Sequence, residues 1–205
     1  MAVAVASGGL RDAALPDCFA TNLYYDRTHG INAVKVLPGE FYATPKKLLL
    51  VTVLGSCVAV CLRDPVARVG GMNHFLLGEP GADVPVGPAD MQRYGVHAME
   101  LLINALMQRG AQRTRLRGHL YGGANIVAGL GGIGSSNAAF ARNFMQTEGI
   151  AVDRCELGGV RARKVEFMPF EGRVRSTLVA EMPPVPARPR KPAPVLAVAG
   201  DVELF

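Results

Sequence analysis

Three short apolar runs with tight turns between them dominate the first half of the chain. The runs cover 48–53, 57–62 and 69–77, and each has the length of a buried strand rather than of a helix. Turn signals separate them at Gly55-Ser56 and at Arg63-Asp64-Pro65. Strands joined by tight turns usually pair with each other, so the pattern predicts antiparallel neighbours.

Two longer segments show the three- and four-residue spacing of apolar side chains that is typical of an amphipathic helix. The first is predicted over 90–109, with the aspartate at its start as N-cap and Gly110 just past its end. The second is predicted to begin at Ser135 or Ser136 and to run to Glu148. Both helices therefore have one apolar face that can pack on a sheet.

Four more strands are predicted after the first helix, at 114–121, 150–156, 160–167 and 173–179. Strands outnumber helices and occur in runs, which favours an α+β fold over a doubly wound one. We expect an α/β sandwich with mixed, largely antiparallel sheets flanked by two main helices. Residues 24–44 show turn signals but no run that predicts a strand.

The composition fits one domain with a tail at each end. The chain has 205 residues and a mass of 21.7 kDa, and six of its 14 prolines lie between Pro183 and Pro194. We expect a flexible N-terminal tail over 1–20, a folded domain over 21–181, and a Pro/Ala-rich linker with a C-terminal tip over 182–205.

The chain lacks the marks of a membrane or secreted protein. No apolar run approaches the roughly 20 residues of a membrane helix, and the N-terminus lacks the basic and apolar regions of a signal peptide. Four cysteines are too few for a disulfide scaffold. We therefore expect a cytoplasmic protein without direct membrane insertion.

The net charge of +5 raises the question of nucleic-acid binding. The arginines lie in sets spaced by two, which places each set on one face of a strand: Arg113, Arg115 and Arg117, then Arg161 and Arg163, then Arg173 and Arg175. No aromatic residues interleave with them, and no helix-turn-helix or zinc-finger pattern is present. These sets indicate a solvated sheet face or a surface for an acidic protein rather than a nucleic-acid site.

The residues with the clearest chemical potential are Cys57 and His74. Cys57 follows Gly55-Ser56 at the start of a predicted strand, where backbone N–H groups can point toward an oxyanion. His74 lies in the next strand, so the turn between the strands can bring the two side chains together. An imidazole beside a thiol favours the thiolate, which is the minimum requirement for nucleophilic catalysis.

Other interpretations of these residues stay open at this point. Free cysteines are usually buried as small apolar residues, and this interpretation is favoured for Cys61, which lies four residues after Cys57. A metal site built on both cysteines and His74 lacks the usual CxxC spacing. Cys18 and Cys155 have no histidine near them in sequence and receive no role.

A glycine-rich segment offers an alternative function. Residues Gly129–Gly134 match GxGxxG before a predicted helix, and Asp153 follows 19 residues after Gly134, which is the order of a dinucleotide-binding fingerprint. The strand before the motif is short, and too few residues follow Asp153 for a second nucleotide-binding half. A non-catalytic or nucleotide-binding module is therefore the alternative to a thiol enzyme.

Seven segments in order resemble the chemoreceptor glutamine deamidase family (CheD). They are AVKVLPGEFYAT, TVLGSCVAVCLRDP, GGMNHFLL, RYGVHAMELLINALMQRGA, YGGANI, IGSSNAAF and GGVRARKVEF. The resemblance implies an α/β sandwich related to bacterial deamidating toxins, with Cys57 as nucleophile, His74 as base and Thr52 as the third catalytic residue. Ser56 and Asn73 are candidates for holding the substrate amide.

The resemblance also implies what such a protein acts on. The expected reaction hydrolyses glutamine side-chain amides to glutamates on the cytoplasmic helices of chemoreceptors, through a Cys thioester. No cofactor or metal is implied. Members of the family can also bind a CheC-type phosphatase, which makes such a phosphatase a candidate partner.

Overall fold

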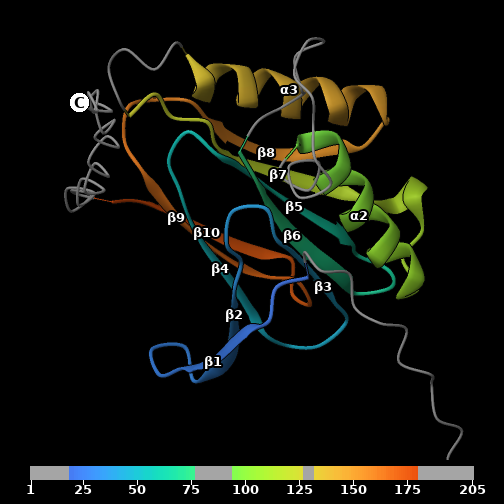
Figure 1. The fold of residues 1–205 in the computed structure, drawn as a ribbon. Helices are drawn as coiled ribbons and strands as arrows, with labels where there is room; N and C mark the ends of the chain where they lie inside the picture. Colours follow the sequence, from blue (N-terminus) through green and yellow to red (C-terminus); the bar gives the residue numbers. More distant parts are fainter. Residues whose placement is uncertain (1–18, 77–93, 127–131, 180–205) are drawn as a thin grey trace, which may run out of the picture.

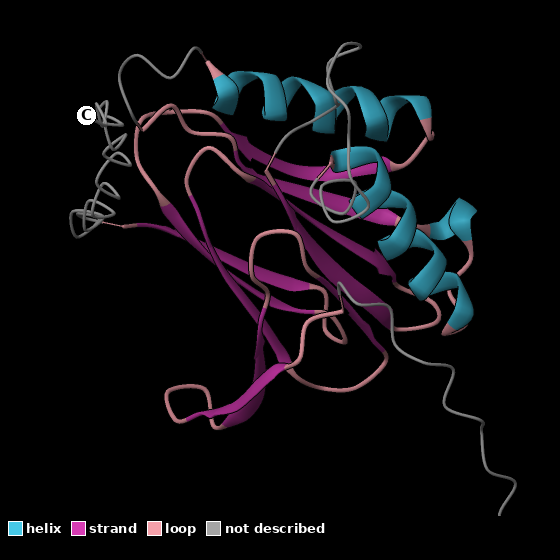
Figure 2. Ribbon diagram, viewed as in Figure 1, coloured by secondary structure: helices cyan, strands magenta, loops and turns pink. Residues whose placement is uncertain are grey.

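The protein is a three-layer structure of two helices and two facing sheets (Figures 1 and 2). The structure, a computed structural model, describes residues 19–76, 94–126 and 132–179. One sheet has the order β1-β2-β4-β9-β10 and contains β1 (Asn22–Asp26), β2 (Ile31–Lys35), β4 (Leu49–Leu54), β9 (Arg163–Met168) and β10 (Arg173–Leu178). We call it the outer sheet, because no described helix covers it.

The second sheet, here called the inner sheet, lies between the outer sheet and the helices. It has the order β3-β6-β5-β7-β8 and contains β3 (Phe41–Thr44), β6 (Val69–Phe75), β5 (Val58–Asp64), β7 (Arg117–Gly122) and β8 (Ala151–Leu157). The helices α2 (Gly95–Gln108) and α3 (Ile133–Thr147) cover its other face (Figure 1). Only β2 with β4 and β7 with β8 pair parallel, so the predicted α+β class with largely antiparallel sheets is confirmed.

The alternation of side chains along β5 divides the interior into two cores. Val58, Val60 and Leu62 face the helices and pack in the core with residues of α2 such as Leu102. Cys57, Ala59 and Cys61 face the outer sheet instead and pack in a second core. Because both faces of this strand are buried, the run CVAVCL is continuously apolar rather than alternating.

Both predicted helices are present, but their starts differ from the prediction. Helix α2 begins at Gly95, and the predicted cap at position 90 lies outside the described residues. Helix α3 begins at Ile133, so the predicted start at Ser135 or Ser136 is wrong. Its N-cap is Gly132 in a left-handed conformation, and neither helix has a side chain that caps its N-terminus.

All seven predicted strands are present, but three further strands were missed. They lie within 22–44, where the segments are only four or five residues long and β1 is largely exposed. Their conformation depends on pairing rather than on an apolar run of their own, since β1 pairs with β2, β2 with β4 and β3 with β6. The strand predicted over 114–121 begins instead at Arg117, because Arg113–Arg115 form a 3₁₀ turn.

The packed part of the chain includes Phe19 and Ala20, which are buried. The ring of Phe19 contacts that of Phe41 edge to face, with 5.4 Å between the ring centroids. The predicted tails over 1–20 and 182–205 lie almost wholly outside the described residues, so their proposed character stays a prediction.

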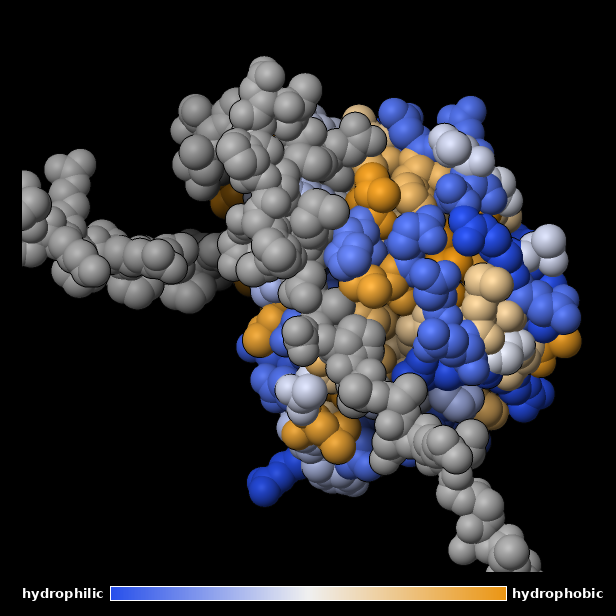
Figure 3. All heavy atoms as spheres, turned by 45° about the vertical axis from the view of Figure 1, so that its right-hand side comes forward, coloured by the Kyte–Doolittle hydropathy of each residue, from blue (hydrophilic) through white to orange (hydrophobic). Residues whose placement is uncertain are grey.

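The first set of arginines is paired with carboxylates of the protein itself. Arg115 contacts Asp64, Arg117 contacts Asp153 on β8, and Arg113 contacts Glu148. These three arginines therefore do not form a free basic surface. Figure 3 shows hydrophilic residues spread among apolar ones over the visible face. Within the described ranges, neither helix has the length and hydropathy required of a membrane span.

A buried carboxylate stabilises the turn between β5 and β6. The side chain of Asp64 is fully buried and accepts hydrogen bonds from the backbone N–H groups of Val66, Ala67 and Gln112 and from the Arg115 guanidinium. Burial alone would raise the pKa of Asp64, but these hydrogen bonds outweigh it and hold the pKa well below its usual range. A turn follows β5 as predicted, but it lies at 65–68, because Arg63 and Asp64 are the last residues of the strand. Asp64 also ties the hairpin to the segment before β7.

We expect Asp64→Ala to lower the free energy of unfolding by about 3 kcal/mol, because it leaves several buried donors without an acceptor. Urea unfolding at pH 7 measures this difference. The folded-state pKa of Asp64 is depressed, so its contribution is present above the unfolded-state pKa of about 3.9 and is lost as the pH falls below it. The gap between wild type and variant should therefore shrink below about pH 4.

The matched control is Glu171→Ala, since Glu171 is an exposed carboxylate near the β9–β10 turn. It should change the free energy of unfolding by less than about 0.5 kcal/mol. Equal stabilities of Asp64→Ala and wild type at pH 7 would contradict the role given to this carboxylate.

Candidate active site

The hairpin of β5 and β6 brings Cys57 and His74 to the same face of the inner sheet. Ala59 and His74 are direct partners across the two strands, so their side chains share a face. Cys57 lies two residues before Ala59 and therefore points to that face as well, which is the face turned toward the outer sheet. The structure thus places both predicted residues in the seam between the two sheets.

Thr52 reaches the same seam from the other side, because it lies on β4 of the outer sheet. The distance from Thr52 Oγ1 to His74 Nδ1 is 2.8 Å, and the hydroxyl also donates a hydrogen bond of 2.8 Å to the carbonyl of Val36. The three residues predicted from sequence are therefore brought together by the contact between the two sheets. The Thr52–His74 hydrogen bond spans that contact.

These hydrogen bonds determine which ring nitrogen of His74 carries the proton. The single hydroxyl proton of Thr52 is used by the carbonyl of Val36, so Thr52 Oγ1 accepts from His74 Nδ1–H. The carbonyl oxygen of Val36 lies 3.4 Å from His74 Nδ1. It can only accept a hydrogen bond, so it favours the same tautomer. His74 Nε2 then bears a lone pair, and it is buried without a hydrogen-bond partner among the described residues.

Burial keeps both members of the Cys57–His74 pair uncharged. Desolvation lowers the pKa of His74 to about 4, although the hydrogen bond to Val36 opposes this change. Desolvation raises the pKa of the Cys57 thiol to about 11, against the hydrogen bonds from its own backbone N–H and from the Ser56 side chain. Desolvation therefore opposes the thiolate that the sequence leads us to expect beside an imidazole, and it favours the neutral form of both groups in the free protein.

Hydrogen bonds from the segment after β7 hold the backbone around Cys57. The carbonyl of Cys57 accepts a hydrogen bond of 2.8 Å from Gly123 N–H, and that of Gly55 accepts one of 2.9 Å from Ala124 N–H. The N–H groups of Ser56 and Cys57 make no hydrogen bond to another described residue. Gly122 adopts a φ of 107°, and a side chain there would clash with the Cys57 carbonyl, so only glycine fits at this contact.

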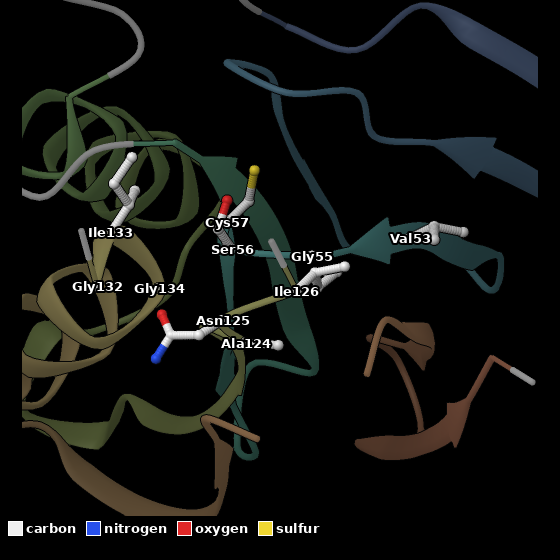
Figure 4. Close-up of a pocket in the computed structure, with 10 residues that line it drawn as sticks. All are labelled: Val53, Gly55, Ser56, Cys57, Ala124, Asn125, Ile126, Gly132, Ile133 and Gly134. Carbon is white, nitrogen blue, oxygen red and sulfur yellow. The ribbon is translucent and has the colours of Figure 1, made fainter. Parts of the chain in front are cut away.

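Cys57 is one of the residues that line a pocket of about 300 Å³ (Figure 4). The walls come from the end of β4, the turn after it, the segment after β7 and the first turn of α3: Val53, Gly55, Ser56, Cys57, Ala124, Asn125, Ile126, Gly132, Ile133 and Gly134. Figure 4 shows the Ser56 hydroxyl beside the Cys57 sulfur. None of these ten side chains is charged, so the pocket suits a neutral group better than a carboxylate.

Asn73, the other predicted substrate ligand, is not brought together with Cys57. It alternates with His74 along β6 and points to the helix side of the inner sheet. Its amide oxygen accepts from Val60 N–H at 3.0 Å, and its amide nitrogen lies 3.2 Å from Met99 Sδ. The side chain is fully buried in these contacts, which tie α2 to the strands beneath it.

Gly132 and Gly134, the last glycines of the glycine-rich segment, line the pocket. Residues 127–131, which include Gly129 and Gly131, lie outside the described residues. Asp153 lies near the middle of β8, four residues and about 13 Å from the carboxyl end where a ribose would bind. A hydrogen bond from Arg117 holds the pKa of Asp153 below its usual range. This position does not favour the nucleotide-binding alternative.

The structure describes two further cysteines, and their surroundings differ. Cys61 is buried in the core between the sheets, as predicted, while Cys155 is exposed and Cys18 lies outside the described residues. Cys61 is a direct partner of His119 on β7, a proximity that sequence spacing did not predict. In the part of the chain that the structure describes, no group of three His, Cys, Asp or Glu residues could hold a metal ion.

Sequence reasoning missed one polar residue of this region. Asn137 on α3 is fully buried and donates from Nδ2 to the carbonyls of Ser56 and Leu76. The only sequence signal was its position, one helical turn after Gly134 at the start of the helix that follows the glycine-rich segment.

The chain is similar to proteins of one family along most of its length. Residues 79–177 match the family model CheD, described as chemotactic sensory transduction. A Janthinobacterium protein named probable chemoreceptor glutamine deamidase CheD is 44% identical over 198 residues, which cover 91% of this chain and 96% of that protein. A Caulobacter vibrioides protein of the same name is 48% identical over 188 residues, covering 90% and 100%.

Among solved structures, the chain overlaps a crystal structure from Neisseria meningitidis, protein NMB0706 of the DUF152 family. The overlap covers 63% of each chain, with 12% sequence identity and a TM-score of 0.34.

We expect alkylation of Cys57 by iodoacetamide to accelerate about tenfold per pH unit between pH 7 and 10, because the raised thiol pKa keeps the thiolate scarce. At pH 7 the rate should be about 10- to 100-fold below that of a free cysteine. Peptide mapping by mass spectrometry separates Cys57 from the exposed Cys155. A rate that levels off near pH 6 or 7 would instead indicate a thiolate–imidazolium pair.

Proposed function

The chain belongs to the CheD family, and we propose that it is a chemoreceptor glutamine deamidase in which Cys57 is the nucleophile. The observation that carries this proposal is the orientation of His74. Its Nδ1–H is held by Thr52, so the lone pair of Nε2 is free on the sheet face that Cys57 shares. A base whose tautomer is fixed in this way is what an acyl-transfer nucleophile requires.

The first half of the reaction forms a thioester and releases ammonia. The Cys57 thiol transfers its proton to His74 Nε2 as its sulfur attacks the glutamine Cδ. The backbone N–H groups of Ser56 and Cys57 stabilise the oxyanion, since they have no other described acceptor. His74 then donates the same proton to the amide nitrogen, the C–N bond breaks, and ammonia leaves.

The second half returns the thiol and makes the acid. A water molecule gives a proton to His74 Nε2 as its oxygen attacks the thioester carbon. The C–S bond breaks, and the sulfur takes the proton back from His74. The sum is hydrolysis of one amide by one water to a glutamate and ammonia, and no other reactant is needed.

The neutral starting state of the pair suits a neutral substrate. Cys57 and His74 are both uncharged near pH 7, so no buried ion must be maintained between turnovers. None of the ten described residues that line the pocket has a charged side chain to hold the carboxylate of the product. The uncharged amide should therefore bind better than the glutamate, which aids product release.

The names of the similar proteins support chemoreceptors as the substrate class. We propose the cytoplasmic helices of such receptors as the site of modification, which places the protein in the cytoplasm. A CheC-type phosphatase is a proposed partner on the basis of the family resemblance alone. We expect no binding to nucleic acid, because Arg113, Arg115 and Arg117 are already paired with carboxylates.

The test is mass spectrometry of a purified chemoreceptor cytoplasmic fragment after incubation with the protein. Each deamidated glutamine gains about 1 Da, and free ammonia appears in equal amount. Cys57→Ala should abolish both signals, because no thioester can form. Cys155→Ser is the matched control and should retain full activity, since Cys155 is exposed and outside the pocket. Turnover by the Cys57→Ala variant would refute the mechanism.

We expect Thr52→Val to lower kcat on the same fragment by about 10- to 100-fold, because His74 loses the oxygen that fixes its tautomer. The KM should change less than about threefold, since Thr52 does not line the pocket. Thr52→Ser keeps the hydroxyl and should keep most of the activity. If Thr52→Val matched the wild type in steady-state kinetics, the tautomer argument would be wrong.

A further inference from the structure

Asn137 connects the two segments that carry Cys57 and His74. It lies on α3, and its Nδ2 donates a hydrogen bond of 2.9 Å to the carbonyl of Ser56 and another to the carbonyl of Leu76. Ser56 directly precedes Cys57, and Leu76 follows His74 by two residues. One fully buried side chain on a helix therefore holds the backbone on both sides of the proposed reacting pair.

The chemistry of the contact fixes the orientation of this amide. Two carbonyl oxygens face it, and only the NH₂ group can donate to both, while the opposite orientation would set oxygen against oxygen. The other atom, Oδ1, is buried with no hydrogen-bond partner among the described residues. A buried acceptor without a partner is unfavourable, so the arrangement is retained at a cost to stability.

The Ser56 carbonyl and the Cys57 N–H belong to the same peptide unit. In a trans peptide these two groups point in opposite directions, and no cis peptide bond is present. The hydrogen bond from Asn137 draws the carbonyl of Ser56 toward α3. The N–H of Cys57 then points away from α3.

We propose that Asn137 is a positioning residue of the deamidase reaction, which sets the direction of the Cys57 N–H so that it meets the oxyanion. This inference rests on the proposed function, since it assigns a role within that reaction. Asn137 is not among the residues that line the pocket. It acts through the peptide bond between Ser56 and Cys57, and its second hydrogen bond keeps the end of β6 in register with that peptide.

The sequence before Asn137 allows the helix to come this close. Gly134 lies one turn earlier on the same face of α3, and a Cβ there would clash with the carbonyl oxygen of Ala124. A larger residue at position 134 would hold the first turn of α3 away from the segment after β7. The amide of Asn137 would then no longer reach Ser56.

The experiment compares two substitutions at position 137 with the same two at position 143. Asn137→Ala removes the amide, and Asn137→Asp keeps its shape but replaces the NH₂ donor with an oxygen. Asn143 is an exposed asparagine on the same helix, so Asn143→Ala and Asn143→Asp are matched controls. Each variant is measured for kcat and KM on the receptor fragment, for the rate of Cys57 alkylation by iodoacetamide, and for its thermal unfolding midpoint.

Alkylation separates positioning from structural damage, because it consumes the thiol but forms no oxyanion. We expect kcat to fall about 10- to 100-fold in both position-137 variants. This decrease is smaller than that caused by removing an oxyanion donor, because the Cys57 N–H is still present but less well oriented. The KM and the alkylation rate should stay within about threefold of wild type, and the position-143 variants should match wild type throughout.

Other results would overturn the inference. Unchanged kcat in either position-137 variant would show that the amide does not position the peptide. A parallel change in kcat and alkylation, or an exposed and fast-reacting Cys57, would show a purely structural role. If the wild type releases no ammonia from receptor fragments, the proposed function is wrong and the inference fails with it. If the wild type and both position-137 variants are equally active, only the inference is wrong.

Discussion

Burial of β5 on both faces is the constraint from which the rest of the site follows. The helix-facing side chains of this strand are large and fill the core under α2 and α3, while Ala59, at the centre of the other face, is small. The outer sheet can therefore approach closely enough for Thr52 to contact His74 across the seam. A bulkier residue at position 59 would separate the sheets and break the one hydrogen bond that joins their reactive residues.

The same burial decides the charge state of the site. Desolvation raises the pKa of Cys57 and lowers that of His74, which favours the neutral form of both groups. The reactivity proposed for Cys57 therefore rests on geometry: among the described residues, Nε2 of His74 has no hydrogen-bond partner and the N–H groups of Ser56 and Cys57 have no acceptor.

Particular residues show how far the sequence could be interpreted. The turn at Arg63-Asp64-Pro65 was enough to predict that Cys57 and His74 lie on adjacent strands, because a hairpin imposes that proximity. Thr52 was identified as a candidate only from the family resemblance. The spacing of residues along the chain does not show which side chain of the other sheet a residue of β4 contacts. Asn137 was missed, because its hydrogen-bond acceptors Ser56 and Leu76 lie 81 and 61 residues before it in the chain.

The sequence by itself determined the elements, their apolar faces and the order of the reactive residues, because periodicity and turn chemistry are local properties. It also carried the family resemblance, which no spacing rule could replace. Only the tertiary structure decided that two sheets meet over Thr52 and His74, that Asn73 faces the helices, and that the thiol starts neutral. These facts depend on desolvation and on contacts between strands distant in sequence, which no local pattern encodes.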